Sequence, residues 1–318
     1  MKAWLIVVIA LVAVGLIVFV AVMSEYRWDF TKLNTGKFET SRYEINEEFN
    51  SLSMDTDTAD IRFVLSDDKK CKVECYEEEK VRHTVTVREN VLVIEVVNNK
   101  SWYDYIGFNF SSPKLTVYLP KTEYATLSIK EHTGHIEIPS NFVFENVDIS
   151  LSTGNVDTFA STSGLLKIKA STGKISVGNA TVGDLDLSTS TGEIAVSDVS
   201  CTGNIKLKVS TGKTILTDIR CQNLTSDGDT GAISLNSVIA TEKLTITRST
   251  GDVKFNSSDA AEILVETDTG NVTGTLLTDK VFITHTDTGR VNVPETVSGG
   301  KCKITTDTGD IKLEIKHN

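Results

Sequence analysis

The apolar and polar positions of the C-terminal two thirds of the chain repeat every 19 or 20 residues. Each repeat is marked by a Thr-Gly pair, and seven residues before its glycine stands an apolar residue such as Leu127, Leu166 or Ile263. Two residues after the glycine stands Ile or Val, with Thr214 as the exception. The turn glycines are Gly134, Gly154, Gly173, Gly192, Gly212, Gly231, Gly251, Gly270, Gly289 and Gly309. Spacing this regular indicates a structural repeat.

Alternation with a period of two on both sides of each turn predicts two short strands per repeat, each with one inward face. A third short strand is expected where Val199 and Cys201, or Ile219 and Cys221, alternate inward. One repeat cannot bury its inward face alone, so the repeats must stack. The sequence therefore predicts an all-β fold, a parallel β-solenoid (β-helix) of about ten rungs over residues 125–318, and we expect it to be right-handed.

Residues 38–124 follow a different pattern, in which short alternating segments are separated by charged turns, as in an antiparallel sheet. We expect this region to form an N-terminal antiparallel β cap over the first rung. At the opposite end, Lys312 and Lys316 alternate with apolar residues in the last repeat. This pattern predicts that the last repeat is the open end of the stack, with charges that resist end-to-end association.

Residues 3–23 contain no charged side chain and are long enough to cross a bilayer as a helix. We interpret residues 1–24 as a transmembrane signal-anchor and residues 25–37 as a juxtamembrane linker, with cleavage after Ser24 as the alternative. Positive charges flank both sides of the span, so they do not decide its orientation. The acidic remainder, rich in Ser, Thr and Asn, favours a single-pass protein of the cell membrane whose bulk is extracytoplasmic.

Composition limits the partners. The formal net charge is −11 and no Lys/Arg-rich run occurs, so we expect no nucleic-acid partner. The five cysteines do not settle the redox compartment. Cys71 and Cys75 are too far apart along an extended segment to form a disulfide. Cys201 and Cys221 are interpreted as buried free thiols, with a bridge between adjacent rungs as the alternative.

Three features together indicate a family: the run Ser112–Pro120 (Ser-Pro-Lys-Leu-Thr-Val-Tyr-Leu-Pro), the segment Asp57–Phe63 (Asp-Thr-Ala-Asp-Ile-Arg-Phe), and the ladder of Ser/Asp-Thr-Gly-x-Ile/Val turns. Residues 38–318 resemble in these features the bacterial putative-adhesin family called domain of unknown function 4097. The resemblance implies a β-strand-repeat ectodomain at the cell envelope, in a family with some members associated with envelope stress. It supplies no catalytic or binding residues.

The candidate chemistry is sparse. Four turns read Asp-Thr-Gly, but an aspartic protease needs two such carboxylates facing each other, whereas these belong to a repeated turn. Asp268, Asp287 and Asp307 are expected to form a column on consecutive rungs that lacks the ligand set of a calcium site. Glu131, His132 and His135 match no metal signature. We therefore expect no catalytic residue, no cofactor and no metal.

The most unusual group is aromatic: Trp102, Tyr103, Tyr105, Phe108 and Phe110. These side chains either fill the core of the cap or form an exposed loop for an unknown protein or glycan partner at the envelope.

Two functions remain. The first is a non-catalytic envelope scaffold, an adhesin, interaction or stress-associated protein. The alternative is a polysaccharide lyase or hydrolase of the parallel β-helix kind. Such an enzyme needs long rung insertions and aromatic subsites, whereas the rungs vary by one residue and contain no Trp or Tyr. The sequence favours the scaffold.

Overall fold

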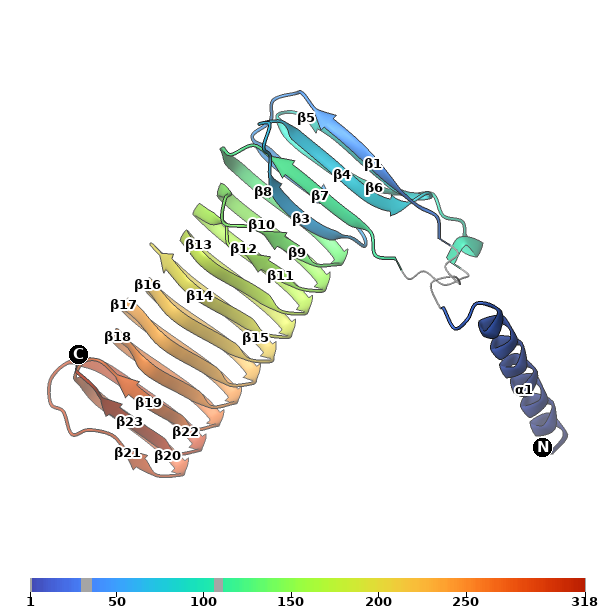
Figure 1. Ribbon diagram of the computed structural model, residues 1–318. Helices are drawn as coiled ribbons and strands as arrows, with labels where there is room; N and C mark the ends of the chain where they lie inside the picture. Colours follow the sequence, from blue (N-terminus) through green and yellow to red (C-terminus); the bar gives the residue numbers. More distant parts are fainter. Residues whose placement is uncertain (1, 30–35, 106–110, 318) are drawn as a thin grey trace.

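A computed structural model describes residues 2–29, 36–105 and 111–317 of the chain (Figure 1). One α-helix, α1 (Lys2–Glu25), precedes the β region. This helix is long and apolar enough to cross a membrane. In the described residues the strands join one continuous sheet, β1 to β23, which is stacked as a rod. The predicted β-solenoid is thus confirmed.

The strands that precede the repeats are β1 (Phe38–Ile45), β2 (Ser51–Asp55), β3 (Asp60–Leu65), β4 (Cys71–Glu78), β5 (Val81–Arg88), β6 (Val91–Asn98) and β7 (Lys114–Leu119), with a short 3-10 helix, η2 (Trp102–Tyr105), between β6 and β7. The strands of the repeats are β8 (Glu123–Thr133), β9 (Ile136–Ile138), β10 (Val143–Thr153), β11 (Val156–Thr158), β12 (Ser161–Thr172), β13 (Ile175–Thr191), β14 (Ile194–Cys201), β15 (Asn204–Thr211), β16 (Thr214–Thr230), β17 (Ile233–Thr250), β18 (Val253–Thr269), β19 (Val272–Leu276), β20 (Lys280–Thr288), β21 (Val291–Asn292), β22 (Gly300–Thr308) and β23 (Ile311–Ile315).

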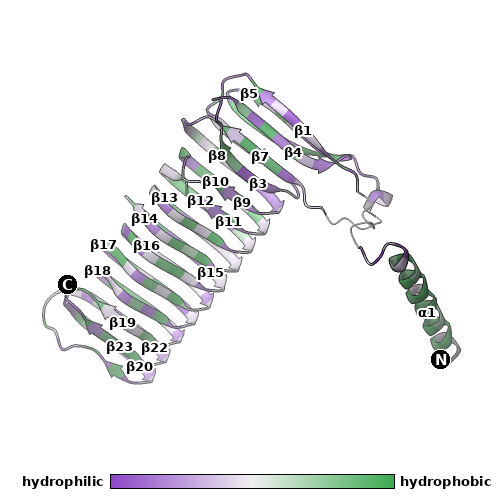
Figure 2. Ribbon diagram, viewed as in Figure 1, coloured by the Kyte–Doolittle hydropathy of each residue, from purple (hydrophilic) through white to green (hydrophobic). Residues whose placement is uncertain are grey.

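Neighbouring rungs pair in parallel and in register, so equivalent residues lie beside one another. Ile175 of β13, for example, pairs with Val156 of β11 and with Ile194 of β14. The inward columns are buried, and Figure 2 shows the resulting alternation of apolar and polar positions along the strands. Val199 and Cys201 are also buried, as predicted for the third side of a rung. The core is a continuous apolar column along the rod.

A second corner in each central rung lies six residues after the turn glycine and was not identified from the sequence. A residue other than glycine adopts positive φ there, for example φ 54° at Asp198 and φ 53° at Asp218. The equivalent residues in other rungs are Asn179, Ser237 and Ser257. Asn and Asp tolerate this left-handed conformation better than most residues. The corner turns the chain from the outgoing strand into the third side.

The stack begins two rungs before the first Thr-Gly repeat. Strands β2 and β3 form the inner of these two rungs and pair in parallel with β8 and β9. The turn of this rung is Asp-Thr-Ala-Asp, and Thr58 forms a bridge with Thr133 of the next rung. Ala59 replaces the usual glycine there. An alanine is tolerated at this position because β6 and β7, which form the next rung outward, are connected by residues 99–113 instead of a Thr-Gly turn.

The predicted antiparallel cap needs a correction. Among the described strands, antiparallel pairing is confined to pairs that involve β1, β4 or β5. By contrast, β6 pairs in parallel with β2, and β7 pairs in parallel with β3. These four strands carry the same inward alternation as the repeats, so they extend the solenoid, while the hairpin of β4 and β5 folds over its end. Residues 38–124 are therefore a mixed region continuous with the solenoid.

The order of the last rungs also differs from the prediction. Strand β22 lies between β18 and β20, and β23 lies between β19 and β21. The rung of Gly309 is therefore inserted between the rungs of Gly270 and Gly289, and β20 and β21 form the end of the stack. The prediction that Lys312 and Lys316 mark the open end is wrong, because the chain crosses back after β21 and adds its last rung inside.

This order can be tested by crosslinking. We expect a disulfide between cysteines introduced at Thr273 and Lys312, which are partners in β19 and β23. Cysteines at Thr273 and Asn292 should not crosslink, because β23 separates their strands. Mass spectrometry of digested, non-reduced protein identifies the linked peptides. A crosslink in the second pair but not in the first would mean that the rungs stack in chain order.

All five cysteines are free and buried. Cys201 and Cys221 lie on neighbouring rungs as predicted, and the interpretation as free thiols is confirmed over the bridge. The Cys201 thiol instead lies 3.1 Å from the carbonyl oxygen of Gly183.

Candidate functional site

The largest irregularity near the N-terminal end of the solenoid is the segment 99–113, here called the aromatic loop, which joins β6 to β7. Helix η2 lies within it and carries three of the aromatic residues predicted from the sequence, Trp102, Tyr103 and Tyr105. Trp102 is 77% exposed and Tyr103 is 56% exposed, and their rings meet edge to face at 5.9 Å. These two side chains are therefore at the surface and do not fill the core of the cap. Phe108 and Phe110 lie outside the described residues, as does the side chain of Tyr105.

Charged contacts hold η2 in place. Lys80, at the turn between β4 and β5, forms an ion pair with Asp104 and lies 5.7 Å from the centre of the Tyr103 ring. The hydrogen bond from Lys80 lowers the pKa of the Asp104 carboxyl, and a second bond from the Ser101 amide adds to the effect. Lys100 forms an ion pair of 2.6 Å with Glu78 of β4. The exposed aromatic rings are thus carried on a segment attached to the β4–β5 hairpin.

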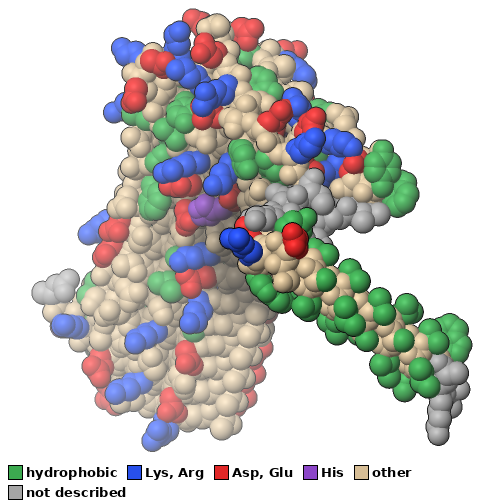
Figure 3. Space-filling model, turned by 45° about the vertical axis from the view of Figure 1, so that its right-hand side comes forward, with side chains coloured by type: hydrophobic (Ala, Val, Ile, Leu, Met, Phe, Trp, Pro, Cys, Tyr) green, Lys and Arg blue, Asp and Glu red, His purple; other side chains and the backbone are tan. Residues whose placement is uncertain are grey.

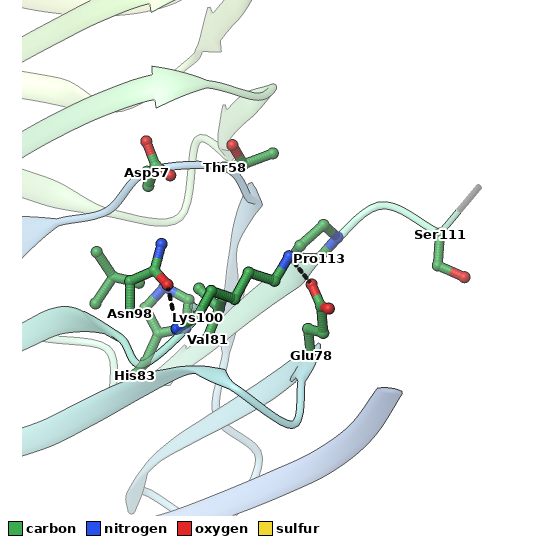
Figure 4. Close-up of a pocket in the computed structure, with 10 residues that line it drawn as sticks. Asp57, Thr58, Glu78, Val81, His83, Asn98, Lys100, Ser111 and Pro113 are labelled. Carbon is green, nitrogen blue, oxygen red and sulfur yellow. Dashed lines mark hydrogen bonds and ion pairs between the residues drawn. The ribbon is translucent and has the colours of Figure 1, made fainter. Parts of the chain in front are cut away.

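A pocket with a volume of about 330 Å³ lies at the base of the aromatic loop (Figure 4). Its walls come from the turn before β3, the β4–β5 hairpin, the end of β6 and both ends of the loop. The lining residues are Asp57, Thr58, Glu78, Val81, His83, Val96, Asn98, Lys100, Ser111 and Pro113. Polar and apolar side chains both line the pocket, and the Lys100–Glu78 ion pair forms part of its wall.

The predicted turn glycines stack along one edge of the rod. Except at Gly289 in the end rung, the amide N–H of each turn glycine donates to the carbonyl oxygen of the threonine in the turn of the adjacent rung, as from Gly154 to Thr172 at 2.9 Å and from Gly212 to Thr230 at 2.8 Å. Asp268, Asp287 and Asp307 are exposed on this edge, and Asp287 contacts His285 at 2.9 Å. Because of the changed rung order, Asp307 lies on the rung between the other two. The turns are therefore structural elements of the stack.

The charges on the sides of the solenoid are balanced between rungs. Figure 3 shows basic and acidic side chains interspersed along the visible face of the rod. Lys167 pairs with Asp148 of the preceding rung at 2.7 Å, and Lys174 pairs with Glu193 of the following rung at 3.0 Å. Such exposed pairs contribute little stability each. They leave no extended surface of one sign on this face.

Glu131, His132 and His135 do not converge on one point. The exposed imidazoles of His132 and His135 lie 3.5 and 3.4 Å from Asp57 and Asp157, respectively. Glu131 instead points inward and is buried. Its Oε1 accepts hydrogen bonds from the amides of Ala59 at 3.2 Å and of Thr133 at 3.3 Å. The carboxyl of Glu131 thus joins the first Thr-Gly rung to the rung before it.

Glu131 should make the stability of the solenoid depend on pH. Burial raises the pKa of its carboxyl to about 8, even though the two amide donors lower it. A folded-state pKa above the unfolded one gives stability that is fully present below about pH 4.5 and is lost as the pH rises through 8. We expect Glu131→Gln to remove this loss, which is on the order of 3 kcal/mol.

The measurement is the free energy of unfolding of both proteins at pH 5 and pH 8. The two proteins differ only at this residue, so the difference between the two pH dependences isolates Glu131. Equal pH dependences would show that Glu131 is ionised at neutral pH in the folded protein.

One further set of residues was not predicted from the sequence. Cys75, Glu77 and His83 are all buried, and their ligand atoms lie within 4.8 Å of one another. The alternation of β4 places Cys75 and Glu77 on its inward face. His83 comes from β5 and also lines the pocket. The sequence feature that could have identified part of this set is the alternation along β4, which places Cys71, Cys75 and Glu77 on its inward face.

Comparison with known proteins gives a family. The model of the family described as Toastrack DUF4097 matches residues 49–209 and 202–318. A putative adhesin from Bacteroides fragilis is 16% identical in sequence, with a TM-score of 0.39 over 87% of this chain and 97% of that one. A putative lipid binding protein from Parabacteroides distasonis is 17% identical, with a TM-score of 0.49 over 76% of this chain and 98% of that one. No curated protein matches the sequence.

Proposed function

This chain belongs to the Toastrack DUF4097 family, and we propose that it is a non-catalytic interaction scaffold of the cell envelope, anchored by α1 with its solenoid outside the cytoplasm. The family resemblance seen in the sequence implies such an ectodomain. In this proposal α1 is retained as an anchor, and the solenoid presents its surface to a protein or glycan partner.

The observation that carries the proposal is where the exposed aromatic rings lie. The carbonyl of Lys37, just before β1, accepts a hydrogen bond of 2.9 Å from the amide of Glu79. The next residue, Lys80, holds Asp104 of the aromatic loop. The loop therefore lies where the chain arrives from α1, at the end of the rod nearest the anchor (Figure 1). Exposed Trp and Tyr side chains are typical of binding surfaces.

The uniformity of the rungs supports a scaffold rather than an enzyme. Polysaccharide lyases and hydrolases need a cleft built from insertions, with paired carboxylates. In the described repeats the Thr-Gly turns keep their length, and the aspartates of the Asp-Thr-Gly turns are exposed along one edge instead of facing one another. The aromatic loop is thus the best candidate for partner recognition.

The partner surface is tested by crosslinking in intact cells, using a photoreactive residue at the exposed position Ser101 of the full chain. Trp102→Ala combined with Tyr103→Ala should lower capture of the partner by at least about tenfold, since aromatic anchors carry much of the binding energy at interfaces. Val297→Ala is the matched control, because Val297 is 97% exposed in the loop after β21. Equal capture by wild type and the double variant would refute the proposed surface. Turnover of a polysaccharide by the purified chain would favour the enzyme instead.

A further inference from the structure

Three chemically reactive side chains meet inside the β4–β5 hairpin. On β4, the inward residues Cys75 and Glu77 flank the exposed Tyr76, and on β5 His83 points toward the same interior. The exposed fractions are 0% for Cys75, 1% for Glu77 and 4% for His83. A thiol, a carboxyl and an imidazole are thus held together away from water.

The hydrogen bonds of this cluster are incomplete. Oε2 of Glu77 lies 2.9 Å from Nδ1 of His83 and accepts the His83 amide at 2.7 Å. Oε1 of Glu77 and Nε2 of His83 are buried and have no hydrogen-bond partner in the described part of the chain. Tyr43 does not supply one, because its hydroxyl donates to the main-chain carbonyl of His83 at 2.8 Å. A buried polar atom without a partner is costly, so these two atoms indicate a missing ligand.

We propose that Cys75, Glu77 and His83 bind one divalent transition-metal ion of the zinc type. Thiolate, imidazole and carboxylate are the ligand set that zinc prefers, whereas calcium and magnesium take oxygen ligands. The thiol and imidazole therefore select the class of metal. This site differs from the group Glu131, His132 and His135, and it goes beyond the expectation from the sequence that no metal is bound.

Three protein ligands leave a fourth position of a tetrahedral ion for water or another small ligand. His83 forms part of the wall of the pocket under the aromatic loop, so the ion and its fourth ligand have a route through that pocket. If Nδ1 of His83 and Oε2 of Glu77 both bind the ion, the distance between these two atoms must increase from 2.9 Å to about 3.3 Å. The larger value is the distance between two ligand atoms of a tetrahedral ion with bonds of about 2.05 Å. A bound ion would join β4 to β5 beside the aromatic loop.

Metal binding must also release a proton. The thiolate is the form of cysteine that binds a metal ion, so the Cys75 thiol must lose its proton on binding. The sulfur–metal bond forms as the thiol proton leaves to solvent, and no electron is transferred. Affinity for the ion should therefore increase with pH.

The experiment uses the full chain in detergent, treated with a chelator and then titrated with Co²⁺. Wild type should bind one Co²⁺ per chain and show the near-ultraviolet charge-transfer absorption of a thiolate–cobalt bond. Cys75→Ser should abolish that absorption. Cys71→Ser is the matched control, because Cys71 is also inward on β4 and buried but lies outside the cluster. It should keep the absorption and the stoichiometry.

Two further readouts separate loss of ligation from loss of folding. His83→Gln should weaken Co²⁺ binding at least about tenfold, a loss seen even when a supporting residue of a metal site is removed. Added Zn²⁺ should raise the melting temperature of wild type and of Cys71→Ser but not of Cys75→Ser. Absence of the charge-transfer absorption in wild type, or an unchanged absorption in Cys75→Ser, would overturn the proposed site. Failure of partner capture by the aromatic loop would leave these metal measurements unaffected.

Discussion

Gly212→Ala is expected to unfold the central rungs of the solenoid. Gly212 has φ 143°, a conformation that side chains rarely adopt, and a Cβ atom built there would lie 1.6 Å from the carbonyl oxygen of Gly192 in the preceding rung. The two backbones cannot separate without straining the hydrogen bond from the Gly192 amide to Thr211, which joins these two rungs, or the one from the Gly212 amide to Thr230 of the following rung. We expect a loss of stability on the order of 4 kcal/mol or more, which is exceptional for a single substitution.

Gly178→Ala provides the matched control. At Gly178 the nearest atoms to an added Cβ are Oγ of Ser197 at 3.2 Å and the ring of Phe159 at 3.3 Å, and both are side-chain atoms that can shift. We expect a change within about 1 kcal/mol. Thermal unfolding followed by far-ultraviolet circular dichroism compares the two variants. Similar melting temperatures would mean that the stacked turn glycines are not close-packed as described.

Ile205→Asp should have a comparable effect through the core. Ile205 is 1% exposed and lies between Leu185 and Leu224 in the stacked inward column. An aspartate there places an unpaired carboxylate in an apolar interior, which we expect to cost several kcal/mol. The variant should unfold at a much lower denaturant concentration than wild type.

Ser200→Asp introduces the same charge on the outside of a nearby rung. Ser200 is exposed and pairs with Arg220 of the following rung, so the carboxylate has both water and a cation near it. We expect little change in stability. If Ile205→Asp melts like Ser200→Asp, the column that contains Ile205 does not face the interior.

Much of the fold could be predicted because the stacked columns impose the same residue type on every rung. The turn glycines and the apolar position seven residues earlier locate the strands, and these strands are present. The rung of β2 and β3 was not recognised because Ala59 replaces its glycine, although Asp57-Thr58 and Ile61 keep the pattern. A search that relies on the turn glycine therefore misses this rung.

The repeat could not predict the order of the last rungs. Because every rung has the same residue types at equivalent positions, one rung can stack equally well on any other. The local signal lies in the connection after β21. Pro294 has no amide N–H to donate to a neighbouring strand. Val297 is exposed, although it lies in the part of the repeat that forms the third strand in earlier rungs. These residues end the regular course of the chain and let it cross back.

The candidate sites were predictable only in part. The sequence identified Trp102 and Tyr103 as unusual, but their exposure depends on the attachment of η2 to Lys80, a long-range contact. The alternation of β4 predicts that Cys75 and Glu77 face inward. Their meeting with His83 depends on the register of the β4–β5 hairpin, where Glu78 pairs with Val81. A periodic pattern specifies faces of strands, whereas a site requires register between them.

The central claim, that α1 anchors an extracytoplasmic solenoid, is tested most directly by adding protease to intact cells from which any outer barrier has been removed. The full chain carries a tag after Asn318, and a cytoplasmic protein serves as the control for cell integrity. We predict that the protease removes the tagged region while the cytoplasmic control stays intact, and that untreated cells retain the full-length chain in the membrane fraction. Protection of the tagged region until the cells are lysed would contradict the account.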